Sequence, residues 1–202
     1  MRLLTLFIKF AVKHPGIMES KLFLQAMLVF PAKISKTYDE KIAGSGNDYS
    51  VDLEQGLTQI FNKPQRILDL CTGTGFAAFK AAEAFPLATI DAVDQIAEMI
   101  DIARRKEKES GIKNTHFKKG NATELAYDDN EFDFILTSNA PIYLFEATRV
   151  LRPGGLLLVV YSFGEDAFVN TNKSITLYLE KNGLKLLEIK SMGSGAYVLG
   201  QK

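Results

Sequence analysis

Residues 67–76 read ILDLCTGTGF, a short apolar run that passes directly into a glycine-rich turn. The run has the length and composition of a buried strand. Gly73 and Gly75 let the backbone bend sharply and approach a ligand closely, because no Cβ stands in the way. The stretch therefore predicts a strand, a turn and a helix, with a ligand site at the carboxyl end of the strand.

The sequence around this turn alternates short apolar runs with helical patterns. Such alternation is typical of βαβ units, which pack as a parallel sheet with helices on both faces. A helix over residues 51–61 is expected to lead into the core, which starts near Pro64. Strands are expected over residues 66–71, 88–93, 115–118, 132–137 and 156–161, and helices over residues 77–84, 96–110 and 142–150.

The pattern changes after Tyr161. A helix is expected over residues 174–181, followed by strands over residues 184–190 and 196–201. The glycine-containing turn at residues 192–195 is too short for a crossover helix, so these two strands are predicted to be antiparallel neighbours.

The first 45 residues differ in character from the rest. Two apolar stretches are separated by His14-Pro15-Gly16 and closed by Pro31, which predicts two short helices. Seven cationic and three anionic side chains give this segment a net charge of +4. Two interpretations stay open: the segment packs on the sheet or on a second subunit, or its basic, apolar surface rests on a membrane and admits a lipid-like substrate. Residues 1–50 are thus a predicted N-terminal helical extension, and residues 51–202 one α/β domain.

Composition limits the classes of function. The 202 residues include 24 Lys and Arg and 24 Asp and Glu, so no global field attracts nucleic acid, and no DNA partner is expected. The only cysteine is Cys71, and no signal-like segment precedes the core, which favours the cytoplasm, with peripheral membrane contact as an option. With only His14 and His116 beside that cysteine, neither a metal site nor a nucleophilic triad is supported.

Two classes of ligand fit the glycine-rich turn. Residues 73–78 also satisfy the dinucleotide fingerprint, which has an acidic residue about 20 positions further on. Asp94 supplies that residue and indicates a ribose in either case. Asp69 favours S-adenosylmethionine (AdoMet), because a carboxylate here would repel a pyrophosphate but suits the ammonium group of a methionine.

Four segments, in order along the chain, resemble the signatures of the class I AdoMet-dependent methyltransferases, a Rossmann-like family. They are residues 68–75, 90–95, 120–122 and 132–135. A fifth, RVLRPGG at residues 149–155, resembles the turn before strand five in the small-molecule and quinone-methylating branches. The resemblance implies a doubly wound, mostly parallel seven-stranded sheet of order 3-2-1-4-5-7-6 with an antiparallel last strand.

The resemblance also implies the cofactor, AdoMet, with S-adenosylhomocysteine as product, and its site. Asp69 and the turn would line the methionine part, Asp94 would bind the ribose, and Asn121, where the family usually has Asp, would accept a hydrogen bond from adenine through its amide oxygen. The cofactor residues carried over are Asp69, Cys71, Gly73, Thr74, Gly75, Asp94, Gln95, Met99, Asn121, Ala122 and Ser138.

The acceptor is less clearly indicated. Residues 139–143, Asn-Ala-Pro-Ile-Tyr, lie where amino-methyltransferases carry Asn-Pro-Pro-Tyr, which makes Asn139 and Tyr143 candidate substrate residues; Tyr38 and Tyr49 are two more. Ala140 replaces one proline and Ile142 displaces the tyrosine by one position, so the favoured alternative is a loop that only closes the cofactor pocket. No catalytic residue is assigned, because methyl transfer from a sulfonium mainly requires alignment and the cofactor carries its own leaving group. The expected function is methylation of a small-molecule or lipid-like acceptor. The alternatives are a methyltransferase acting on protein or RNA and a non-catalytic AdoMet-binding module.

Overall fold

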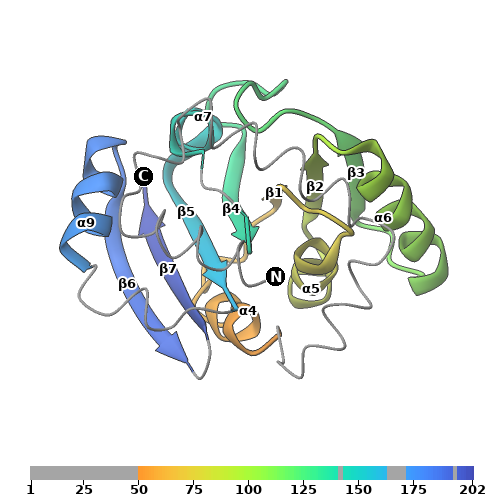
Figure 1. Cartoon of the computed structure of the whole chain (residues 1–202), viewed down its shortest axis with the longest axis horizontal. Coiled ribbons are helices and arrows are strands. Elements are labelled where there is room, and N and C mark those ends of the chain that lie inside the picture. The colour runs from red at the N-terminus through yellow and green to blue at the C-terminus, as the bar shows by residue number, and fades with distance from the viewer. Residues whose placement is uncertain (1–49, 141–142, 163–171, 193–194) are drawn as a thin grey trace, which may run out of the picture.

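The computed structural model describes residues 50–140, 143–162, 172–192 and 195–202, whose strands form one seven-stranded sheet with helices on both faces (Figure 1). The helices predicted within residues 1–45, and with them Tyr38 and Tyr49, lie outside the described residues. No helix among the residues described is long and apolar enough to cross a membrane.

The strand order is β3-β2-β1-β4-β5-β7-β6, as predicted. Neighbouring strands from β3 to β5 are parallel, whereas β7 is antiparallel to both β5 and β6. Figure 1 shows β6 and β7 at one end of the sheet and β3 at the other. The strands are β1 (Arg66–Leu70), β2 (Thr89–Asp94), β3 (Thr115–Lys119), β4 (Phe132–Ser138), β5 (Leu151–Tyr161), β6 (Lys185–Met192) and β7 (Gly195–Gln201).

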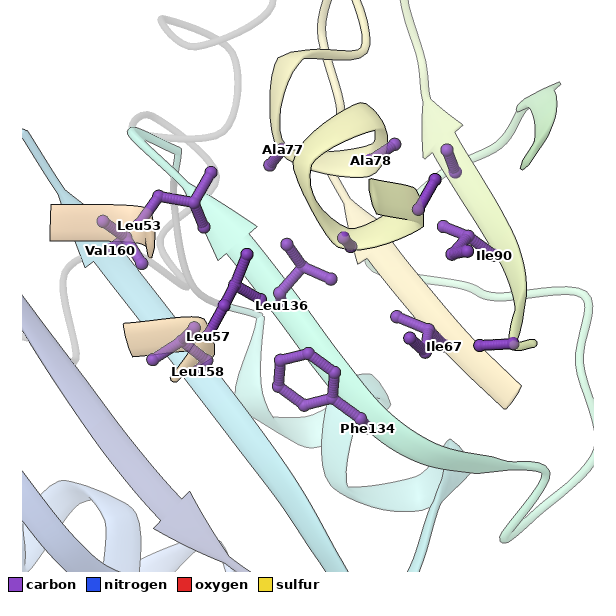
Figure 2. Close-up of a cluster of buried hydrophobic side chains, with 14 of the residues drawn as sticks. Leu53, Leu57, Ile67, Ala77, Ala78, Ile90, Phe134, Leu136, Leu158 and Val160 are labelled. Atoms are coloured by element: carbon purple, nitrogen blue, oxygen red, sulfur yellow. The ribbon is translucent and has the colours of Figure 1, made fainter. Parts of the chain in front are cut away.

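Each face of the sheet buries its own apolar cluster. On one face α4 (Ser50–Leu57), α5 (Phe76–Ala84) and α6 (Ala97–Ser110) pack against residues such as Ile67 and Phe134, as Figure 2 shows for α4 and α5. On the other face lie α7 (Leu144–Val150) and α9 (Asn172–Lys181). Alternate strand residues therefore point into different clusters, as period-2 side-chain geometry requires.

The predicted elements are confirmed with small shifts at their ends. The first described helix ends at Leu57 rather than at residue 61. Strand β5 begins at Leu151 rather than at residue 156, because Leu151 pairs with Phe132 and the segment around Gly154 pairs with Lys202. The expected proline-glycine turn thus continues the strand.

Arg149, in the last turn of α7, has a structural role that the sequence pattern did not indicate. Its guanidinium donates hydrogen bonds to the carbonyls of Leu125 and Tyr127 and to the carboxylates of Asp129 and Glu146. Arg149 therefore holds the connection between β3 and β4 against α7, and its planar fork of donors suits this many acceptors.

Candidate functional site

The turn after β1 is held in a left-handed conformation by backbone bonds at the carboxyl edge of the sheet. Cys71, Gly73 and Gly75 have φ values of 58°, 56° and 92°. The N–H of Thr72 donates to the carbonyl of Val93 at 3.0 Å, which ties the turn to the end of β2. A Cβ added at Gly73 would meet no atom within 4 Å, so there is open space beside the backbone where a ligand can approach.

Asp69 lies under this turn with no exposed surface. Its Oδ2 accepts a hydrogen bond of 2.6 Å from the hydroxyl of Thr72. Its Oδ1 is buried and has no hydrogen-bond partner among the residues described. Buried polar atoms are normally paired, so an unpaired carboxylate oxygen beside an open turn indicates a missing donor or cation. The ammonium group of a methionine has this chemistry.

The ionisation of Asp69 leads to a prediction about stability. Burial raises the pKa of Asp69 to about 7; the Thr72 hydroxyl and the backbone N–H of Ala78 oppose this rise, and the charge of Asp94 adds to it. In an unfolded chain the pKa of an aspartate is about 3.9. At a pH between about 4 and 7, Asp69 therefore binds a proton in the native state that it does not bind in the unfolded chain. The stability contributed by this group is fully present below about pH 4 and is lost as the pH rises through about 7.

We therefore expect the free energy of unfolding to fall by about 1 kcal/mol between about pH 6 and 8, compared with the Asp69→Asn variant, in which this titration is absent. Urea denaturation of both proteins at the two pH values measures the difference. A difference between wild type and variant that is the same at both pH values would contradict the raised pKa.

Asp94 at the end of β2 faces the same turn. Its Oδ2 accepts the N–H of Gly73 at 2.9 Å, and its Oδ1 accepts the N–H of Ile96 at 2.9 Å. Burial raises the pKa of Asp94, while these backbone donors lower it. Each carboxylate oxygen has a further lone pair, so Asp94 can accept hydrogen bonds from a ribose diol while it holds the turn in place.

The residues expected near ribose and adenine fall into two groups. Met99 and Ala122 are buried, and Gln95 is half-buried. Asn121 is exposed, and its amide oxygen accepts hydrogen bonds from both the N–H and the hydroxyl of Thr123. The oxygen that was expected to meet adenine is thus engaged within its own loop.

The end of β4 brings the remaining predicted residues to the same edge. Ser138 and Asn139 are half-buried, and Asn139 has a φ of 54°. Tyr143 is buried and packs in the cluster against which Cys71 lies. Membership of that cluster places Tyr143 on the face of the sheet against which Cys71 packs. Burial raises the pKa of the Tyr143 phenol, and the charge of Asp94 raises it further.

The chemistry open to this site is binding and alignment. Burial raises the pKa of the Cys71 thiol, and the charges of Asp94 and Asp69 raise it further, so the thiol stays protonated and is a poor nucleophile. Thr74 and Gly75 are buried in the turn itself. Thr72, whose hydroxyl donates to Asp69, was not predicted as a site residue. Its position three residues after the strand aspartate is the feature of the sequence from which this contact could have been predicted.

Comparisons with known proteins bear on the fold and the family. A family model described as a methyltransferase domain matches residues 61–188. The demethylmenaquinone methyltransferase of Deinococcus radiodurans is 30% identical over 182 residues, covering 86% of this chain and 75% of that protein. A SAM-dependent methyltransferase from Aquifex aeolicus has a similar structure, with a TM-score of 0.63, 21% identity, and coverage of 80% of this chain and 96% of that chain.

Other relatives match over a shorter stretch. The demethylmenaquinone methyltransferase of Listeria welshimeri is 35% identical over 106 residues, which is 48% of this chain and 45% of that protein. The match thus spans about half the length of this relative, whereas the Deinococcus match extends over most of both chains.

Proposed function

The chain belongs to the class I AdoMet-dependent methyltransferases, and from this membership we propose that it transfers a methyl group from AdoMet to a small, quinone-like acceptor. The observation that carries the proposal is Asp69, a fully buried carboxylate whose Oδ1 lacks a partner beside the open glycine turn. AdoMet supplies a methyl group that is already activated by the positive sulfonium to which it is bonded.

The residues of the chain would hold and orient the cofactor. Asp69 would accept hydrogen bonds from the ammonium group, and Asp94 would accept them from the ribose hydroxyls. Met99 and Ala122 would pack against the base. The site therefore works by alignment and by excluding water, which suits an in-line displacement that needs no dedicated base.

Demethylmenaquinone methyltransferases among the relatives point to the acceptor class, a flat, oxygenated ring with an apolar tail. Tyr143 is the buried aromatic side chain that we propose to meet such a ring. The basic, apolar segment of residues 1–45, with its net charge of +4, is the part that we propose to contact the membrane in which such an acceptor dissolves.

Calorimetry and a turnover screen test this function together. We expect AdoMet and S-adenosylhomocysteine to bind and NAD not to bind. We also expect S-adenosylhomocysteine to form with a reduced, prenylated naphthoquinone, and faster when that acceptor is presented in anionic rather than neutral vesicles. Tighter binding of NAD would refute the cofactor assignment, and turnover only with a protein or RNA acceptor would refute the acceptor class.

A further inference from the structure

Four hydrogen bonds join the residues that follow β4 to the end of β5. The N–H of Asn139 donates to the carbonyl of Val160 at 2.8 Å, and the N–H of Ser162 donates to Asn139 Oδ1 at 2.8 Å. Asn139 Nδ2 donates to the hydroxyl of Ser162 at 3.2 Å, and the hydroxyl of Tyr161 donates to the carbonyl of Ala140 at 3.0 Å. We call this set the β4–β5 clasp.

Asn139 is the centre of the clasp, and its side chain is used within it. The amide oxygen and the amide nitrogen both bond to Ser162, and Nδ2 also lies 3.5 Å from the hydroxyl of Ser138. In the Asn-Pro-Pro-Tyr interpretation this amide would hold the acceptor. Here it faces β5 instead, in a left-handed backbone conformation that asparagine tolerates better than most residues do.

Tyr161 connects the clasp to Tyr143. Its hydroxyl holds the carbonyl of Ala140, and its ring belongs to the same buried cluster as Tyr143. Cys71 of the turn packs against that cluster, and the charge of Asp94 raises the pKa of the Tyr143 phenol further. The position of the Tyr143 ring beside the glycine turn therefore depends on where the clasp fixes the chain after β4.

We propose that Asn139 is a positioning residue, which acts through the β4–β5 clasp to fix Tyr143 against the cofactor turn, and that Tyr143 alone of the two meets the acceptor. This inference rests on the proposed function for the acceptor and on the described contacts for the clasp. A tyrosine phenol is protonated at neutral pH, so Tyr143 offers a flat ring and a neutral hydrogen-bond donor. That combination selects an acceptor that is itself flat and carries an oxygen.

The variant that tests the clasp is Asn139→Gly, because glycine keeps the left-handed backbone and removes the side-chain bonds. The matched control is Asn130→Gly, another left-handed asparagine, with a φ of 62°, which precedes β4 at the opposite edge of the sheet. The chain has seven tyrosines and no tryptophan, so tyrosine emission can be observed directly. The difference between each protein and its Tyr143→Phe counterpart isolates the emission of Tyr143.

In Asn139→Gly we expect acrylamide to quench the Tyr143 emission more strongly than in the wild type, because the ring is no longer held in its buried position. We also expect the KM for the reduced naphthoquinone to rise about tenfold, the size of the loss of one or two hydrogen bonds, with AdoMet affinity within about twofold of the wild type. Asn130→Gly should change none of these. Ser162→Ala removes the bond from Asn139 Nδ2 but keeps the bond from the Ser162 N–H to Asn139 Oδ1, so its KM should rise less than that of Asn139→Gly.

Tyr143 emission that stays shielded in Asn139→Gly, or AdoMet affinity that falls as far as acceptor affinity, would overturn the proposal. The quenching measurement needs neither cofactor nor acceptor. It therefore still tests the clasp if the naphthoquinone proves not to be a substrate, in which case the proposed function fails on its own.

Discussion

Asp69→Asn is expected to weaken AdoMet binding about 100-fold or more without unfolding the protein. The carboxylate is fully buried and its Oδ1 lacks a partner, so it is the group placed to pair with the cofactor ammonium. Removing one member of a buried, charge-assisted pair costs about 3–5 kcal/mol, which exceeds the 2.7 kcal/mol that corresponds to 100-fold in affinity. Titration calorimetry with AdoMet measures the loss.

Asp91→Asn is the matched control. Asp91 is a second buried aspartate in a neighbouring strand, and it pairs with Arg66 at 3.1 Å and Lys118 at 2.9 Å. We expect Asp91→Asn to lose stability but keep its AdoMet affinity. We expect Asp69→Asn to stay folded but lose AdoMet affinity. If both variants lost affinity equally, Asp69 would have no special part in binding.

Gly75→Ala is expected to destabilise the protein by about 3 kcal/mol, the largest effect of a single methyl group in this site. The residue has a φ of 92°, which strains any residue with a Cβ. The added Cβ would also lie 2.9 Å from Phe79 and 3.0 Å from Phe117, whose rings pack together with centroids 5.2 Å apart. Overpacking of this kind costs about 1–3 kcal/mol in addition to the backbone strain.

Gly73→Ala separates the two causes, because its φ is also positive but a Cβ there would meet no atom within 4 Å. We expect it to lose only about 1 kcal/mol, the cost of the strained backbone. Thermal and urea unfolding of both variants give the comparison. Equal losses would mean that Phe79 and Phe117 move aside freely.

The fold was predictable because its strands are short, apolar and separated by clear turns. The glycine turn and Asp69 were enough to locate the carboxyl edge, and the short link between the last two strands required their antiparallel pairing. The sequence pattern did not show which backbone segments pair when they are far apart along the chain. Leu151 joins β5 only because Phe132 and Lys202 are brought beside that segment in three dimensions.

The candidate site was predictable at the level of residues but not of side-chain partners. Asp69 and Asp94 do bond to residues of one turn, and Tyr143 belongs to the cluster against which Cys71 of that turn packs, as their positions after strands indicated. The amide of Asn121 is engaged by Thr123, and that of Asn139 by Ser162. A short polar side chain can bond to its own loop or to the next strand as well as to a ligand, and only the folded backbone decides among these partners.

The position of β7 between β5 and β6 has a consequence for synthesis on the ribosome. Strands β5 and β6 leave the exit tunnel before the strand that joins them, so β6 has no partner in the sheet until β7 has emerged. During that interval the edge of β5, with the apolar Val159 and Val160, is unpaired. Unpaired apolar edges are where nascent chains associate wrongly. Slow emergence of residues 162–195 from the tunnel would prolong this exposure, and chaperone binding is expected to be strongest at that stage.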